Sequence, residues 1–397
     1  MRKYRSIAAR ALLGLGVLAV VDIGLSLSVL RGGMLGKRPL PPFGVEFDPA
    51  QEKILARLES GDVEERITVF DRELGWCARP GSVSASGGTH INSRGMRGRR
   101  EYTALPQADR LRLACFGESF TFCDEVPDES TWPAILERSA PTLEALNFGV
   151  PAYGTDQALL RMRREGIHGA SVVVLGLLLE NIGRNVNRYR PLWNPRTQSP
   201  LAKPRFVLAG ERLELVPQPF ESPFELARAA REGSMLAALA EHEYWSGRPR
   251  LWTGHASSIA RLAAGFFAYR ERDPRRLWLD ESGEPRRVTL ALVESFRAEA
   301  AALGARDFLV LLFPMREEFA DYLAEDRGYW SDLPRLLRAR GLECLDLAPA
   351  LAAETGAAPS SLYKLAHLSE AGNEVVAREL RDWLVRRQHL QAAADEH

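Results

Sequence analysis

Residues 111–122 read LRLACFGESFTF, and this stretch decides the fold. Its first half is a short apolar run that ends in glycine, which is the pattern of a buried strand. The sequence that follows has the pattern of a helix. Similar runs occur farther along the chain, at residues 143–150, 171–179, 307–314 and 342–347. Strands that alternate with helices predict a parallel sheet covered on both faces. We therefore expect an α/β three-layer sandwich with a parallel sheet of about five strands.

The N-terminus contains a separate apolar segment, because residues 11–30 read ALLGLGVLAVVDIGLSLSVL. This length matches the roughly 20 residues that a helix needs to cross a bilayer. The segment is preceded by four basic residues, namely Arg2, Lys3, Arg5 and Arg10. The positive-inside tendency places this end in the cytoplasm. One acid, Asp22, lies in the span, where a lone charge costs roughly 2.5–3.5 kcal/mol. An uncleaved anchor is preferred to a removed signal peptide or a buried helix, since no A-x-A cleavage site follows.

The chain is therefore expected to divide into three parts. Residues 1–31 form a cytoplasmic tail and a transmembrane anchor. Residues 32–68 form a linker rich in Gly and Pro, followed by a short amphipathic helix at 49–60. Residues 69–397 form the main domain, which begins with a turn-rich β-region. An insert at about 188–286, rich in Trp, Pro and Arg, is predicted to be a helical cap or an excursion on the substrate side.

Charge and cysteine content argue against several classes of function. The 52 basic residues balance the 52 acidic residues, so no global charge favours nucleic acid as a partner. The four cysteines, Cys77, Cys115, Cys123 and Cys344, form no CxxC pair and no Cys/His cluster with zinc spacing. We therefore predict no metal and no cofactor. The thiols could be buried, or joined in one or two disulfides.

The loops that follow the strands hold the candidate site, because ligands bind beyond the carboxyl ends of parallel strands. Ser119 follows the first strand at a turn into a helix, where backbone N–H groups favour the negative charge that develops when serine attacks a carbonyl. The same position also suits a helix-capping serine. His367 is the histidine placed after the end of a strand. A weakly basic imidazole is what nucleophile activation requires.

Two further loops could supply hydrogen-bond donors. Residues 147–155 contain Gly and Pro, which imply a tight loop able to present backbone N–H groups, although an ordinary strand-to-helix turn has the same composition. Asn181 leaves the third apolar run, where its amide can donate to an oxyanion or cap a helix. Each pattern is weak alone. Their order and their positions in the predicted sheet together indicate a catalytic site.

These residues resemble the SGNH/GDSL hydrolase superfamily. FGESFTF (116–122) is similar to its first block, which carries the nucleophile and maps to Ser119. NFGVPAYGTDQ (147–157) resembles the second block, whose backbone donor to the oxyanion falls on Ala152, with Gly149 as the less favoured neighbour. HLSEAGN (367–373) resembles the block that carries the base, which maps to His367. The upstream INSRGMRGRREY is similar to the lead-in of bacterial, membrane-anchored members.

The resemblance covers about residues 74–384, apart from the insert, and the expected fold is flavodoxin-like. LLLENIGRN (177–185) resembles the third block, whose Asn amide completes the oxyanion hole. Here the usual N-D reads E-N. The oxyanion donor is therefore Asn181 in a shifted register, or the position holds Glu180 and the donor is lost. The usual Asp before the nucleophile is replaced by Glu118, which supports the turn rather than the reaction.

The most consequential departure concerns the acid that orients the histidine. The family places an Asp three residues before the His, and this chain has Lys364 there. A lysine cannot orient or stabilise an imidazolium. Either His367 works in a dyad steered by a backbone carbonyl, or a distant acid substitutes, with Glu180 and Asp346 as the candidates.

The resemblance implies a serine hydrolase that acts on acyl esters through a Ser-His dyad or triad. By family analogy, the esters belong to envelope or exported polysaccharide. One alternative is an O-acyltransferase that acts on a glycan. Another is a degenerate protein that binds glycan without turnover, which Lys364 and the E-N pair favour. The anchor predicts a single-pass protein of the bacterial inner membrane whose catalytic domain faces the periplasm or exterior.

Overall fold

The computed structural model describes residues 2–28, 30–31, 34–36, 38–64, 66–197, 199–246, 257–354 and 361–390. Its internal contacts divide the chain into two compact units. Unit 1 consists of residues 1–61, 187–202 and 219–276, and unit 2 consists of residues 62–186, 203–218 and 277–397. Both units are therefore built from segments that are far apart in the sequence.

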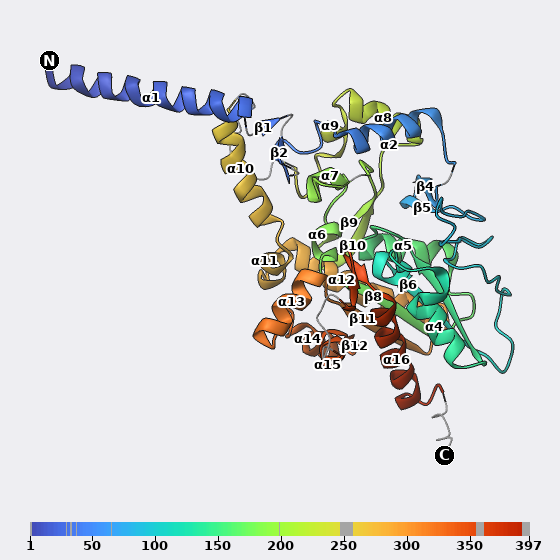
Figure 1. The fold of residues 1–397 in the computed structure, drawn as a ribbon. Coiled ribbons are helices and arrows are strands. Elements are labelled where there is room, and N and C mark those ends of the chain that lie inside the picture. Colours follow the sequence, from blue (N-terminus) through green and yellow to red (C-terminus); the bar gives the residue numbers. More distant parts are fainter. Residues whose placement is uncertain are drawn as a thin grey trace. The chain divides into compact units, whose positions relative to one another are not determined.

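Unit 2 is built on a five-stranded parallel sheet with the strand order β12-β11-β8-β6-β7 (Figure 1). Its strands are β6 (Leu111–Gly117), β7 (Leu143–Gly149), β8 (Val172–Leu178), β11 (Asp307–Phe313) and β12 (Glu343–Asp346). Each strand lies within one of the five predicted apolar runs, so the predicted α/β class and sheet are confirmed. Read from the β7 edge, the order is that of flavodoxin-like folds. In these folds the second strand is added on one side of the first strand, and all later strands are added on the other side.

Helices cover both faces of this sheet because its strands are buried on both sides. On one face, Leu113 and Cys115 of β6 share a core with Trp132, Phe319 and Leu380. The helices of this face are α4 (Trp132–Ser139), α13 (Arg316–Glu325), α15 (Ala348–Ala353) and α16 (Glu370–Arg386). The other face packs against α5 (Thr155–Glu165) and α12 (Glu284–Ala302).

Shorter elements complete unit 2. The helical ones are α3 (Ser119–Phe122), the 3-10 turn η1 (Asp128–Ser130), α6 (Asn181–Arg184) and α14 (Leu333–Ala339). Antiparallel hairpins are formed by β4 (Thr68–Asp71) with β5 (Gly75–Ala78), β9 (Arg205–Ala209) with β10 (Arg212–Val216), and β13 (Tyr363–Lys364) with β14 (His367–Leu368). The β9–β10 hairpin lies inside the region predicted to be a helical insert, which is therefore not helical throughout. All four cysteines are free thiols.

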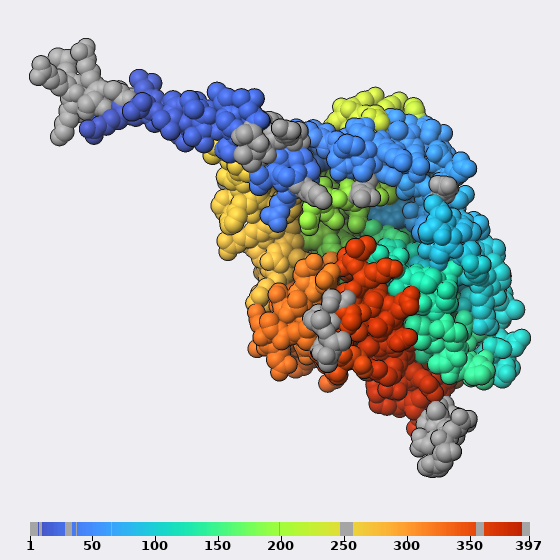
Figure 2. All heavy atoms as spheres, in the orientation of Figure 1, coloured from blue at the N-terminus to red at the C-terminus, as the bar shows by residue number. Residues whose placement is uncertain are grey.

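Unit 1 begins with α1 (Arg2–Ser28), which carries the predicted membrane anchor. Its window Arg10–Leu27 has a mean hydropathy of 1.9, and no part of that window is buried. Figure 2 shows the described side chains of α1 in dark blue. At 1.5 Å per residue this window is roughly 27 Å long, close to the thickness of the hydrocarbon layer of a bilayer. The helix is therefore long and apolar enough to cross a membrane.

The rest of unit 1 consists of a small sheet and several helices. The sheet contains β1 (Leu30–Arg31), β2 (Met34–Leu35) and β3 (Arg38–Pro39). The helices are α2 (Pro49–Ser60), α7 (Arg190–Trp193), α8 (Pro223–Arg231), α9 (Met235–Leu239) and α10 (Ser258–Glu271), and α11 (Pro274–Leu279) contains the boundary with unit 2. The predicted amphipathic helix is α2. Its capping box pairs Asp48 and Gln51 reciprocally, at 2.8 and 3.1 Å.

Candidate functional site

Ser119 is the first residue of α3 and directly follows β6, the strand that lies between β8 and β7. Glycine makes this turn possible. Gly117 has a φ of 157°, and a Cβ there would lie 2.2 Å from Thr121 Oγ1 and 3.1 Å from the Gly176 carbonyl oxygen. The turn places the Ser119 side chain at the carboxyl edge of the sheet, where it is only 5% exposed. Loops from β7 and β8 leave the sheet on either side of it.

His367 lies beside Ser119, although the two residues are 248 positions apart in the chain. Its Nε2 is 2.8 Å from the Ser119 Oγ, a hydrogen-bond distance. The β13–β14 hairpin positions the ring, because the Tyr363 hydroxyl donates to the Pro314 carbonyl at the end of β11, at 2.9 Å. The Phe120 ring packs against the imidazole with centroids 5.2 Å apart. The two residues proposed as nucleophile and base are therefore brought together.

The acid that contacts His367 is Glu125, which the sequence analysis did not single out. Its Oε1 lies 3.2 Å from the His367 Nδ1, on the side of the ring opposite Ser119. The two side chains are about one-fifth exposed, at 18% for His367 and 21% for Glu125. The neighbouring Asp124 is a second acid near this ring. Burial raises the pKa of Asp124, and the nearby His367 acts in the opposite direction.

Arg97 holds the loop that carries Glu125. Its buried guanidinium donates to the carbonyls of Phe122, Cys123 and Val126, at 3.0, 3.2 and 2.7 Å. Its Nε also contacts the Asp128 carboxylate at 3.0 Å. These are charge-assisted hydrogen bonds within a rigid planar fork. Arg97 belongs to the lead-in INSRGMRGRREY, so this motif acts in the structure by shaping the loop that presents the acid.

The two acids predicted as partners of His367 have other partners. Asp346 accepts hydrogen bonds from the Trp330 indole and from the Ala348 N–H, both at 3.0 Å. Glu180 pairs with Arg184 at 2.9 Å, one helical turn away. Lys364, at the family's Asp position, lies directly across the β13–β14 ladder from His367 and is exposed. Glu125 therefore replaces Glu180 and Asp346 as the candidate supporting acid.

The loop after β7 contains the two candidate backbone donors. The Gly149 N–H donates to the Asn147 side chain at 2.9 Å, so it already has an acceptor. A Cβ at Gly149 would lie 2.3 Å from the Phe122 nitrogen, which shows that this glycine serves the close packing of α3 on β7. Ala152 has a φ of 68°, in the left-handed region that is rare for alanine. Such strain is found where a loop is held in a particular shape at a functional site.

The β4–β5 hairpin holds this loop in place. The Trp76 indole donates to the Pro151 carbonyl at 3.0 Å, and the Tyr153 hydroxyl donates to the Trp76 carbonyl at 2.6 Å. The Trp76 and Tyr153 rings also meet edge to face, with centroids 5.8 Å apart. Ala152 is thus bracketed by two anchored neighbours. The predicted β-region at the start of the main domain therefore supports the site.

Asn181, the candidate side-chain donor, begins α6, and two residues separate it from the end of β8. Its side chain is buried, and its Nδ2 lies 3.5 Å from the Thr155 Oγ1 at the start of α5. Its Oδ1 is buried and has no hydrogen-bond partner within the described part of the chain. Asn181 and Ala152 follow β8 and β7, the two strands that flank β6, so the strand order puts both residues at the same edge of the sheet as Ser119.

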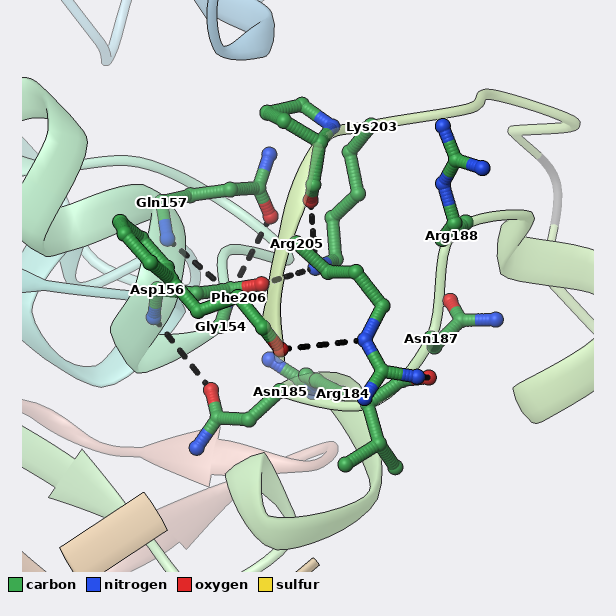
Figure 3. A network of polar contacts seen from close by, with 12 residues as sticks. Gly154, Asp156, Gln157, Arg184, Asn185, Asn187, Arg188, Lys203, Arg205 and Phe206 are labelled. Atoms are coloured by element: carbon green, nitrogen blue, oxygen red, sulfur yellow. Dashed lines mark hydrogen bonds and ion pairs between the residues drawn. The ribbon is translucent and has the colours of Figure 1, made fainter. Parts of the chain in front are cut away.

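A buried polar network behind these loops joins the start of α5 to α6 (Figure 3). Asp156 pairs with Lys203, and both side chains are buried. The Asn185 Oδ1 accepts from the Thr155 N–H at 2.8 Å, and its Nδ2 donates to Thr289 at 2.9 Å. Breaking such a pair would leave an uncompensated buried charge, so the network favours one arrangement of these loops.

Glu118 is a fully buried carboxyl immediately before Ser119, the candidate nucleophile. One oxygen accepts the Phe120 N–H at 3.3 Å, whereas the other has no hydrogen-bond partner among the residues that the structure describes. Burial raises the pKa of Glu118 to about 7, although the nearby Arg184 charge acts in the opposite direction. This carboxyl therefore stays protonated in the folded protein at pH values where a solvated glutamate is ionised.

This pKa predicts that stability falls as the pH rises. Between pH 4.5 and about 7 the folded state binds more protons than the unfolded state, so the free energy of unfolding decreases through this window. The shift corresponds to roughly 3 kcal/mol once Glu118 is ionised. Glu118→Gln keeps the acceptor for Phe120 without the charge. We expect this variant to be more stable than the wild type at about pH 8, by roughly 3 kcal/mol, and nearly equal at pH 4.5.

Urea unfolding of the detergent-solubilised chain at the two pH values measures this difference. Glu211→Gln is the matched control, because the Glu211 side chain is fully exposed and its replacement by the isosteric amide should change the stability little at either pH. Equal stability of Glu118→Gln and wild type at both pH values would show that Glu118 is ionised in the folded state at little cost.

No family model and no curated protein matches the chain. Among solved structures, one is 13% identical and covers 70% of this chain and 97% of its own, with a TM-score of 0.35. Another is 11% identical and covers 68% of this chain and 99% of its own, with a TM-score of 0.33. The second comes from Desulfitobacterium hafniense DCB-2, and its name refers to the G-D-S-L family of lipolytic proteins.

Proposed function

We propose that the protein is a serine ester hydrolase in which Ser119, His367 and Glu125 act as a catalytic triad. The observation that carries this proposal is the pair of contacts on the His367 ring. Its Nε2 is 2.8 Å from the Ser119 hydroxyl, and its Nδ1 is 3.2 Å from the Glu125 carboxylate. A nucleophile in contact with a base that an acid orients is the arrangement that activates a serine.

In the proposed reaction, the Ser119 Oγ attacks the ester carbonyl while the His367 Nε2 takes its proton. The tetrahedral oxyanion accepts hydrogen bonds from the Ala152 N–H and the Asn181 amide. The C–O bond to the alcohol then breaks, and His367 returns its proton to the leaving oxygen. His367 then deprotonates a water molecule, which attacks the acyl-serine. The bond to the Ser119 Oγ breaks, His367 returns the proton to that oxygen, and the carboxylic acid leaves. Glu125 holds the imidazole in the required tautomer and stabilises its cation.

The proposed substrates are acyl esters close to a membrane surface. The apolar helix α1 supports a membrane location, and its basic N-terminal end favours an orientation with the remainder of the chain outside the cytoplasm. We propose the bacterial inner membrane, with the catalytic residues on the periplasmic side. The resemblance to the SGNH/GDSL superfamily favours acyl groups on envelope or exported polysaccharide as the substrate class.

Labelling with a fluorophosphonate tests the proposal directly, because the probe reacts with activated serines. We expect the wild-type protein to be labelled, and peptide mass spectrometry should locate the adduct on Ser119. An aryl acetate added in excess should slow the labelling. A native, folded sample that stays unlabelled, or an adduct on another serine, would contradict the assignment of the nucleophile.

A further inference from the structure

Helix α10 is joined to the apolar helix α1 within unit 1. Asp22, which lies inside the window Arg10–Leu27, accepts hydrogen bonds from the Ile259 N–H at 2.8 Å and from the Ser257 hydroxyl at 3.0 Å. These contacts satisfy backbone and capping groups at the N-terminus of α10, where a carboxylate is favoured. The acid that is unusual in a membrane span thus has a defined role.

A second contact extends this junction. The Ser26 and Ser258 hydroxyls are 2.5 Å apart, so the first turn of α10 lies beside the last part of the apolar window. Figure 1 shows α10 leaving α1 near its C-terminal end. If α1 crosses a bilayer, this junction places the start of α10 at the boundary between the hydrocarbon and the headgroups.

One face of α10 is covered by the segment that follows α1. The Tyr269 hydroxyl donates to the Pro39 carbonyl at 2.8 Å, and the Arg261 Nε donates to the Pro41 carbonyl at 3.0 Å. Gly265 lies against Leu40, so closely that a Cβ would come within 2.6 Å of its Cδ2. The linker therefore holds α10 against the region where the chain leaves α1.

The other face of α10 is apolar and exposed. Phe266 is 65% exposed and Phe267 is 46% exposed, and their rings meet edge to face with centroids 5.5 Å apart. Ala263, one turn earlier, is exposed as well. Adjacent exposed aromatic side chains on an apolar helix are typical of surfaces that bind a partner or a membrane. The direct hydrogen bonds between α10 and the uncovered apolar helix α1 favour the membrane.

We propose that α10 lies in the membrane–water interface and inserts Phe266 and Phe267 among the lipid acyl chains. The protein then contacts the bilayer through a second element besides α1. Tyr269 and the exposed Arg270, at the end of α10, suit the headgroup level, where amphipathic aromatic and basic side chains concentrate. This inference rests on α1 crossing the membrane and is independent of the proposed esterase activity.

Spin labels on the full chain test the proposal in vesicles of phosphatidylethanolamine and phosphatidylglycerol. Cysteine is introduced at one position at a time, as Phe266→Cys or Phe267→Cys. Leu18→Cys in α1 is the lipid-facing reference, and Leu105→Cys is the exposed reference in unit 2, with native exposures of 55% and 69%. The unsubstituted chain, labelled in parallel, accounts for signal from the native thiols. Power saturation then compares accessibility to oxygen, which partitions into lipid, with accessibility to a nickel chelate, which stays in water.

We expect the ratio of oxygen to nickel accessibility at positions 266 and 267 to exceed that at position 105 several-fold and to approach that at position 18. High accessibility to both reagents would mean that α10 faces water and would overturn the proposal. Low accessibility to both would mean that protein covers this face, as in a dimer, and would overturn it equally. A water-like ratio at position 18 would remove the premise that α1 is in the membrane, and the proposal with it.

Discussion

Ser119→Ala is expected to lower kcat/KM for a short-chain aryl ester by on the order of 10⁴-fold or more. Without the hydroxyl no acyl-enzyme can form, and the remaining rate comes from binding and oxyanion stabilisation alone. The loss should appear in kcat rather than in KM, because the hydroxyl bonds to the substrate carbon only as the transition state forms. Initial rates at several ester concentrations separate the two parameters.

Ser86→Ala is the matched control for this prediction, because Ser86 is exposed in a turn, where its hydroxyl contacts that of Ser84. We expect it to retain wild-type activity. The double variant Ser119→Ala/His367→Ala should be no slower than Ser119→Ala alone, since residues that act as one unit lose their effect together. Turnover by Ser119→Ala close to that of the wild type would exclude Ser119 as the nucleophile.

Glu125→Gln is expected to lower kcat by about 10²- to 10³-fold with little change in KM. Gln keeps the size of the side chain but removes the charge that stabilises the imidazolium and selects the tautomer. The His367 Nδ1 and the Glu125 Oε1 are 3.2 Å apart, and both side chains are about one-fifth exposed. Because solvent screens this pair, the loss of kcat should be smaller than for a fully buried acid. Glu125→Asp, which keeps the charge on a shorter stem, should fall between the wild type and Glu125→Gln.

Two further variants make this result specific. Glu129→Gln changes an exposed acid close to the same loop and should leave kcat unchanged. Asp124→Asn tests the neighbouring acid. Loss of activity in Asp124→Asn with full activity in Glu125→Gln would identify Asp124 as the acid that supports His367. The contact between His367 and Glu125 would then not contribute to catalysis.

Much of the sheet was predictable from local sequence. The five strands were visible because buried parallel strands are continuous apolar runs, and glycine ends β6 and β7 where the chain must turn sharply. The positions of Ser119 and His367 followed from the rule that sites form at the carboxyl edge of such a sheet. Their 2.8 Å contact agrees with that expectation.

Glu125 escaped prediction because nothing in its local sequence distinguishes it. The chain contains 52 acidic residues, and Glu125 lies in a loop without periodicity. Its position depends on Arg97, which holds the loop through carbonyls that are 25 to 29 residues away in the sequence. The acidic pair Asp124-Glu125, shortly after α3, was the one local indication. Because Lys364 stands where the family has its Asp, the acids next to the ends of other strands, Glu180 and Asp346, were the predicted substitutes.

The partner of Asp22 was equally invisible in the sequence. Asp22 and Ile259 are 237 residues apart, and no local pattern connects an acid in an apolar helix with the start of another helix. The β9–β10 hairpin was missed for a different reason. In residues 205–216 apolar and polar side chains alternate only weakly, and the sequences on both sides are typical of helices. Composition alone therefore favoured a helical insert.

The distance along the chain between hydroxyl and imidazole has a consequence for biosynthesis. A ribosome that adds roughly 5–20 residues per second needs on the order of 10–50 s to travel from codon 119 to codon 367. Throughout that interval the nascent polypeptide holds a serine without its proton acceptor. If the proposed mechanism holds, a product released before the β13–β14 hairpin is made has Ser119 without its base and is expected to be inert.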